Sequence, residues 1–234
     1  MGTGSMSDRI GGTVTIDMGY YPGGNNIEVD SKGRYYYKSD NKEVILKKED
    51  YPIKYGPYKK LTHTLQGVGI KSIAHNGVPQ TVFPDNISGW ESVTVYYWSG
   101  DTNHNQPLLL ELKPTTGSHS YYALNTDRNK WSTWKKDTDA AGTLRERLNK
   151  QNCKKNGAHI MDLSRRGSYQ CPGCVCEWIA VSSLPVPLYN YKRFKHYISS
   201  ANTSITRFKD NENDQVGLPS IKHRLYQCLQ LSIL

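Results

Sequence analysis

The chain has 234 residues, a formal net charge of +9 and a mean hydropathy of -0.68. No run approaches the about 18 apolar residues of a membrane-spanning helix, so the sequence excludes such a span. Its 17 Tyr and 5 Trp can still build a core, and both residue types favour strands. Residues 1–12, which lack the apolar centre of a secretory signal, are expected to form a flexible leader.

Short runs of alternating apolar residues fill residues 13–136. In the strongest of them, Val93, Val95 and Tyr97 alternate with other residues, so these three are expected to face inward. Turn signals such as Asn76-Gly77 separate the runs. Short strands at this spacing predict a mainly β fold, with an antiparallel β-sandwich-like repeat domain over 13–136.

A helix and a cysteine-rich connector are predicted over residues 137–188. Thr143 and Glu146 have the spacing of a capping box, in which each side chain accepts a backbone N–H of the first turn. Gly157 is a residue type that ends helices. We expect one short helix over about 140–153, and no longer helix elsewhere in the chain.

Part of the first domain recurs after this connector. Residues 58–63 (YKKLTH) match residues 191–196 (YKRFKH), and residues 72–73 match residues 204–205, in the same order. The match predicts that residues 189–234 are a truncated second β repeat, and the alternative is a chance similarity within a chain rich in Tyr and Lys.

The end of the second repeat would lack partner strands under this prediction. Residues 218–234 are therefore expected to be poorly ordered and to drive self-association. The side chains expected to take part are Leu225, Leu229, Leu231 and Ile233.

Two groups of motifs resemble a known family. Residues 96–101 (YYWSGD) followed by 107–110 (PLLL) resemble repeats in large hypothetical, antigen-like proteins of piroplasmid, Theileria-type parasites. Residues 148–153 and 169–174 resemble the connector between such repeats. The resemblance implies a surface or secreted antigen expanded by duplication, and it supplies no catalytic residues.

Four of the five cysteines lie between positions 153 and 176. The first interpretation is disulfide bonding among Cys153, Cys171, Cys174 and Cys176, with Cys153 bonded to Cys171 or Cys174. The second is a zinc site, for which Cys153, His159, Cys171 and Cys174 would supply four ligands. A redox Cys-Pro-Gly-Cys motif and inert thiols are the remaining alternatives.

No motif in the chain predicts an enzyme. There is no HExxH pair, GxSxG elbow, P-loop or dinucleotide fingerprint, so neither a catalytic residue nor a cofactor is predicted. His63 and His196 occupy matching positions of the repeat, which favours a structural hydrogen bond over catalysis.

Basic residues concentrate in residues 142–209, with twelve Lys and Arg against three acidic residues. Three tyrosines, at 189, 191 and 197, lie among the last of them, as in polyanion-binding surfaces. The alternative is a solvated face of a β domain. The candidate anion-binding residues are Lys154, Lys155, Arg165, Arg166, Lys192, Arg193 and Lys195.

Two functions follow as hypotheses. The first is a non-enzymatic repeat-type interaction protein or antigen, secreted or at a cell surface, of unknown ligand. Its partner would be a host or parasite surface protein or a polyanion, with sulfated glycan and anionic lipid ranked above nucleic acid. The alternative is a cytoplasmic, basic polyanion-binding module with a structural zinc site. Oxidised cysteines would favour the first hypothesis, and bound zinc the second.

Overall fold

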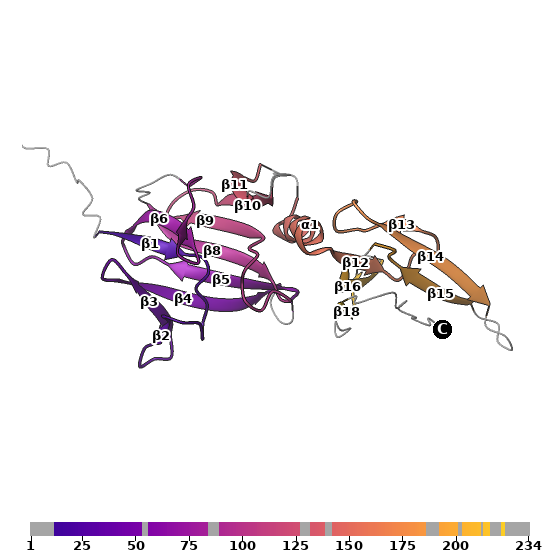
Figure 1. Cartoon of the computed structure of the whole chain (residues 1–234), viewed down its shortest axis with the longest axis horizontal. Helices are drawn as coiled ribbons and strands as arrows, with labels where there is room; N and C mark the ends of the chain where they lie inside the picture. The colour runs from indigo at the N-terminus through magenta and orange to yellow at the C-terminus, as the bar shows by residue number, and fades with distance from the viewer. Residues whose placement is uncertain are drawn as a thin grey trace, which may run out of the picture. The chain divides into compact units, whose positions relative to one another are not determined.

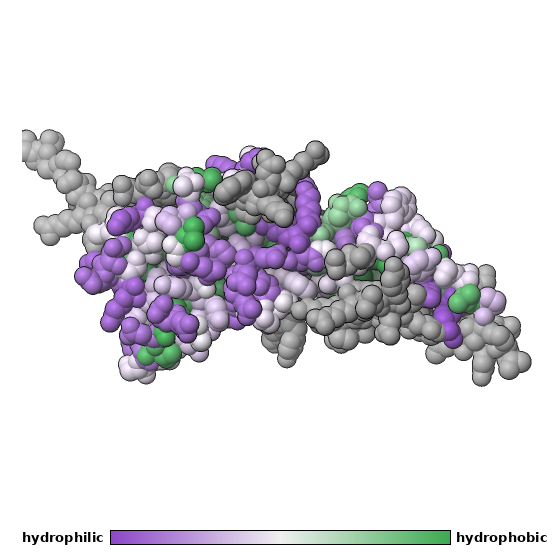
Figure 2. Space-filling model, viewed as in Figure 1, coloured by the Kyte–Doolittle hydropathy of each residue, from purple (hydrophilic) through white to green (hydrophobic). Residues whose placement is uncertain are grey.

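The computed structural model describes residues 12–52, 56–83, 89–126, 132–138, 142–185, 192–200, 203–211, 213–215 and 221–222. It divides into two compact units, Met1–Thr138 and Asp139–Leu234 (Figure 1). In the part of the chain that the structure describes, no helix is long and apolar enough to cross a membrane. On the face seen in Figure 2, hydrophobic residues form only small, separate patches within a hydrophilic surface.

The first unit contains an eight-stranded antiparallel sheet in the order β11-β10-β9-β8-β5-β4-β3-β2. The strands are joined mostly as hairpins, which is why sequence neighbours pair. Their bounds are β2 (Glu28–Val29), β3 (Tyr35–Ser39), β4 (Lys42–Tyr51), β5 (Tyr58–Thr64), β8 (Trp90–Trp98), β9 (Leu109–Pro114), β10 (Ser120–Thr126) and β11 (Ser132–Lys136).

A second, smaller sheet of this unit has the order β1-β6-β7, with β1 (Thr13–Asp17), β6 (Gly69–His75) and β7 (Val78–Pro79). Strand β1 runs parallel to β6, so the expectation of a purely antiparallel domain is wrong at this pair. Parallel neighbours need a long connection between them, and strands β2 to β5 supply it.

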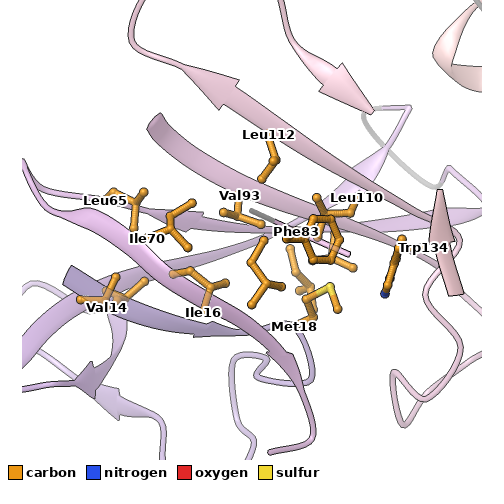
Figure 3. Packing of buried hydrophobic residues seen from close by; sticks show 14 of the residues in the cluster. Val14, Ile16, Met18, Leu65, Ile70, Phe83, Val93, Leu110, Leu112 and Trp134 are labelled. Atoms are coloured by element: carbon orange, nitrogen blue, oxygen red, sulfur yellow. The ribbon is translucent and has the colours of Figure 1, made fainter. Parts of the chain in front are cut away.

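The core of the first unit lies between these two sheets (Figure 3). Val14, Ile16 and Ile70 come from the small sheet, and they pack with residues of the large sheet in one buried cluster. The predicted inward positions are confirmed, because Val93, Val95 and Tyr97 are fully buried in that cluster. The other members are Met18, Tyr37, Val44, Leu61, Leu65, Ile73, Phe83, Leu110, Leu112 and Trp134.

A buried carboxylate ties the end of β1 to the turn between β6 and β7. Asp17 accepts hydrogen bonds from the backbone N–H groups of Gly19 (2.9 Å), Asn76 (2.8 Å) and Gly77 (2.7 Å). The predicted Asn76-Gly77 turn is confirmed, and both residues have positive φ, of 51° and 79°. Glycine and asparagine adopt that conformation at low cost.

The second unit begins with helix α1 (Leu144–Asn156). The predicted capping box is confirmed, since Thr143 accepts the backbone N–H of Glu146 and the Glu146 carboxylate accepts that of Thr143. Gly157 ends the helix with φ 56°, in the left-handed conformation expected of a C-terminal cap. The helix therefore starts a turn later than predicted and ends at the predicted glycine.

Two small sheets make up the rest of the second unit. The first joins β12 (Ala158–Asp162), β16 (Ser204–Asp210), β17 (Asn213–Asp214) and β18 (Ile221–Lys222), and the second joins β13 (Tyr169–Gln170), β14 (Trp178–Pro185) and β15 (Lys192–Tyr197). The expected boundary between residues 188 and 189 is not observed, because β14 pairs with β15 and β12 with β16 across it. The predicted connector and second repeat thus form one unit.

The parallel pairs of the two units have the same irregularity. The register of β1 on β6 shifts by one residue between Val14 and Thr15, and that of β12 on β16 shifts between His159 and Ile160. In both pairs the shift follows the second residue of the first strand. Of the tail predicted to be poorly ordered, 218–234, the structure describes only Ile221 and Lys222, and the rest lies outside the described residues.

Candidate metal centre

Four side chains of the second unit, from three segments, converge on one point. Cys153 lies on α1, His159 on β12, and Cys171 and Cys174 on the turn between β13 and β14. One ligand atom of each lies within 4.8 Å of the corresponding atom of every other. These are the four residues that the sequence offered as zinc ligands.

The separations fit a tetrahedral ion. With zinc bonds of about 2.3 Å to sulfur and about 2.05 Å to nitrogen, two sulfurs would be about 3.8 Å apart and sulfur and nitrogen about 3.6 Å. The Sγ atoms of Cys153 and Cys171 are 3.8 Å apart, and the Sγ of Cys174 is 3.8 Å from the Nδ1 of His159. A zinc ion would fit between them after small adjustments.

Backbone N–H groups point at the sulfur atoms of the turn. Ile160 and Gly173 each donate to the Sγ of Cys171 at 3.4 Å, and Cys176 donates to the Sγ of Cys174 at 3.3 Å. Such hydrogen bonds stabilise thiolates and orient them as ligands. A side chain at Gly173 would place a Cβ 3.1 Å from the Sγ of Cys153, so glycine lets the turn approach the helix.

The two buried thiols are hydrogen-bonded to each other. A hydrogen bond from Cys153, against the cost of burial, lowers the pKa of the Cys171 thiol, and the backbone N–H groups of Ile160 and Gly173 add to this effect. The same hydrogen bond and burial raise the pKa of Cys153. A thiolate at Cys171 is the form that a metal ion binds.

The centre is enclosed by protein. Cys153, His159 and Cys171 are buried, and Cys174 is half-buried. Four protein ligands leave no position for water or substrate, which is the arrangement of structural rather than catalytic zinc sites. With Cys174 as a free thiol, the donor set can therefore hold zinc, but it offers no open coordination position for chemistry on a substrate.

The cysteines that were offered as disulfide partners are arranged differently from the expected pairing. The bonded pair is Cys174–Cys176, whose Cα atoms are 5.1 Å apart. Cys153 and Cys171 lie close together but keep free thiols. Cys174 is therefore both a member of the four-residue donor set and a half-cystine.

The candidate anion-binding residues lie on three segments of the second unit, which are helix α1, the turn after β12 and strand β15. Arg165 contacts the carboxylate of Asp162 at 3.3 Å, and Arg166 donates to the carbonyl of Leu163 and stacks over Phe194, with its guanidinium 4.5 Å from the ring centroid. Lys154 and Lys155 lie in the last turn of α1, where cations interact favourably with the helix dipole.

The remaining candidates lie on β15. Arg193 pairs with Leu184 of β14 and Lys195 pairs with Ser182, so both lie on the same side of the sheet. Lys192 pairs with Pro185, and its side chain, like residues 189 and 191, lies outside the described residues.

Exposed apolar side chains near β15 were missed by sequence reasoning. Trp178 is 61% exposed and Leu184 is 49% exposed, both on β14. Trp178 and Leu184 are six positions apart, and an even separation places both side chains on one face of a strand, opposite to the buried Ile179. This spacing is visible in the sequence and could have indicated an exposed apolar face.

The two histidines at matching positions of the predicted repeat each contact a tyrosine hydroxyl. The Nδ1 of His63 lies 3.0 Å from the hydroxyl of Tyr37, and that of His196 lies 3.3 Å from the hydroxyl of Tyr169. Burial lowers the pKa of His63 to about 4 and also lowers the pKa of His196. Both rings are thus neutral at pH 7, as suits a structural hydrogen bond.

No family model, curated protein or solved structure matches the chain.

Proposed function

We propose that the protein is a non-enzymatic interaction module of two duplicated β units, the second of which is held together by a structural zinc ion. The observation that carries the zinc is the convergence of Cys153, His159, Cys171 and Cys174, from three separate segments, within 4.8 Å. The sandwich-like, repeated organisation read from the sequence is part of the same proposal.

Hydrogen bonds at corresponding positions support the duplication. Asp17 at the end of β1 accepts the N–H two residues later, and Asp162 at the end of β12 does the same with Ser164 at 3.1 Å. The next residue after each aspartate donates to the strand opposite, from Met18 to Ala74 and from Leu163 to Lys209. This correspondence aligns Ile73 with Phe208, so the sequence match of residues 72–73 with 204–205 is displaced by three residues. A third correspondence is the hydrogen bond between a tyrosine and a histidine, which joins Tyr37 to His63 in the first unit and Tyr169 to His196 in the second.

These correspondences align the strands of the first unit with those of the second, and the alignment explains why only the second unit would need a metal. In the first unit, Thr15 donates its backbone N–H to the hydroxyl of Ser39 at 2.8 Å, where the second unit has Ile160 donating to Cys171. Ser39 and Val14 therefore take the places of Cys171 and His159. The first unit has a large apolar cluster instead, whereas the buried cluster of the second unit is small. A structural metal commonly stabilises domains with little core.

Metal analysis of the reduced protein tests this proposal. We expect one zinc per chain, and cobalt in its place should give the intense visible absorption of tetrahedral thiolate coordination. Cys171→Ser should abolish stoichiometric binding, whereas the control Cys228→Ser, which changes none of the four converging residues, should leave it unchanged. A reduced, folded protein that takes up neither metal would exclude the zinc centre.

A second candidate function is polyanion binding by the outward face of β14 and β15. Ala180 pairs with Tyr197 and Ser182 with Lys195, so a basic and an aromatic side chain lie two residues apart on that face, each beside a small residue of β14. Tyr197 is 38% exposed. No described residue of these two strands on this side is acidic.

The corresponding face of the first unit differs in a way that supports this candidate. When β4 and β5 are aligned with β14 and β15, Glu43 takes the position of Trp178. Thr64 takes the position of Tyr197. That face of β4 also carries an ion pair between Lys47 and Glu49, at 2.9 Å. Charges on it are thus already compensated, whereas the second unit presents cations beside exposed rings.

Binding of labelled polyanions should map to this face. We expect Trp178→Ala to weaken binding of an oligothymidylate or a heparin oligosaccharide about 5- to 100-fold, because stacking contributes about 1–3 kcal/mol per ring. Lys195→Ala should weaken binding and reduce its salt dependence. Fluorescence anisotropy at several salt concentrations measures both effects. Lys71→Ala, an exposed lysine of the first unit, is the matched control. Equal binding by all four proteins would exclude this face, and the preferred probe would identify the source of the polyanion.

A further inference from the structure

Cys174 has two competing partners in the second unit. Its Sγ is one of the four donors of the metal centre, 3.8 Å from the Nδ1 of His159, and it also forms the disulfide with Cys176. A sulfur in a disulfide is not a thiolate, so it no longer serves as a zinc ligand of ordinary strength. Zinc binding at four ligands and this disulfide therefore exclude each other.

The two cysteines differ in exposure, which sets the order of events. Cys176 is exposed, Cys174 is half-buried, and Cys153 and Cys171 are buried. Susceptibility to oxidation follows thiolate character and exposure. Cys176 is therefore the thiol that a small oxidant in solution reaches first, and its sulfur stands next to a zinc ligand.

We propose that the Cys174–Cys176 pair is a redox switch that releases the zinc, with a peroxide as the oxidant. This inference rests on the proposed zinc centre. Under reducing conditions the Cys174 thiolate binds the metal ion and Cys176 remains a free thiol. Oxidation converts both to the disulfide seen in the structure and leaves the ion with three ligands, which are Cys153, His159 and Cys171.

The reaction balances with one peroxide. The thiolate of Cys176 attacks one peroxide oxygen, forming an S–O bond as the O–O bond breaks, and hydroxide leaves and takes up a proton to become water. The Cys174 thiolate then attacks the Cys176 sulfur, forming the S–S bond as the S–O bond breaks, and the second oxygen leaves as hydroxide, which is also protonated. The two sulfurs lose two electrons in total, the peroxide gains them, and zinc departs as Zn²⁺.

Zinc release from the intact, zinc-loaded protein tests the switch. Hydrogen peroxide should release one zinc per chain to a chromophoric chelator, and mass spectrometry should locate the new disulfide at residues 174 and 176. A phosphine reductant followed by added zinc should restore the centre. Cys176→Ser keeps all four ligands, and it should bind zinc equally but release it about tenfold more slowly or not at all. Cys228→Ser is the matched control and should release zinc as the unchanged protein does.

The outcomes separate this inference from the proposal on which it rests. Release from Cys176→Ser at the unaltered rate, or a disulfide between Cys153 and Cys171, would overturn the switch while leaving the zinc centre in place. Failure of the reduced protein to bind zinc at all would overturn the zinc centre itself.

Discussion

Removal of zinc from the reduced protein should unfold the second unit and leave the first folded. Metal binding contributes about 10–16 kcal/mol to the folding of small zinc-finger peptides, which is at least comparable to the about 5–15 kcal/mol stability of a whole domain. The ligands join α1, β12 and the β13–β14 turn, so loss of the ion removes the contact that the three segments share.

Hydrogen exchange measures both units in one sample. After chelation in the presence of reductant, we expect amides of β12, β14 and β16 to lose protection, whereas those of β5 and β8 keep it. Cys171→Ser should reproduce this result without a chelator, and Cys228→Ser should not. Retained protection in β12 and β16 after complete zinc removal would contradict a structural role for the ion.

Asp17→Ala should destabilise the first unit by about 2–4 kcal/mol. The substitution leaves three backbone N–H groups, those of Gly19, Asn76 and Gly77, without their acceptor, and each buried unpaired group costs about 1–3 kcal/mol. The expected loss lies near or below the bottom of the summed range of about 3–9 kcal/mol, because Asn76 and Gly77 are exposed and water can replace the carboxylate there. The expected fall in melting temperature of this unit is about 10 °C.

Calorimetry of the zinc-loaded protein tests this value. Asp17→Asn keeps one acceptor oxygen and should have an intermediate effect. Glu49→Ala removes an exposed partner of Lys47 and should change the stability by no more than about 0.5 kcal/mol. Equal stability of Asp17→Ala and Glu49→Ala would show that the carboxylate does not hold the β6–β7 turn.

Local signals in the sequence determined several elements of this protein. The helix was predictable because Thr143, Glu146 and Gly157 act through bonds within one or two turns, and all three form the predicted caps. The inward positions of β8 followed from alternation along a single strand, which needs no knowledge of its neighbours. The mainly β class with one short helix is confirmed for the same reason.

Long-range pairing was decided only by the tertiary structure. Nothing in residues 13–17 indicates that β1 would run parallel to a strand more than 50 residues away, because either direction satisfies the same alternating pattern. The second unit is a further example. The sequence predicted a connector over 137–188 and a separate repeat over 189–234, but pairing of β12 with β16 joins the two segments in one unit.

The candidate metal centre shows the same division between sequence and tertiary structure. The sequence supplied the donor types, and it left disulfide, zinc and free thiol open because cysteine spacing alone allows all three. Only folding brings Cys153 of the helix within 3.8 Å of Cys171, 18 positions later, and sets His159 beside Cys174. The sequence by itself thus determined local structure and the chemical types of the candidate ligands. The tertiary structure decided which of them meet, because only packing of separate segments brings distant side chains within coordination distance.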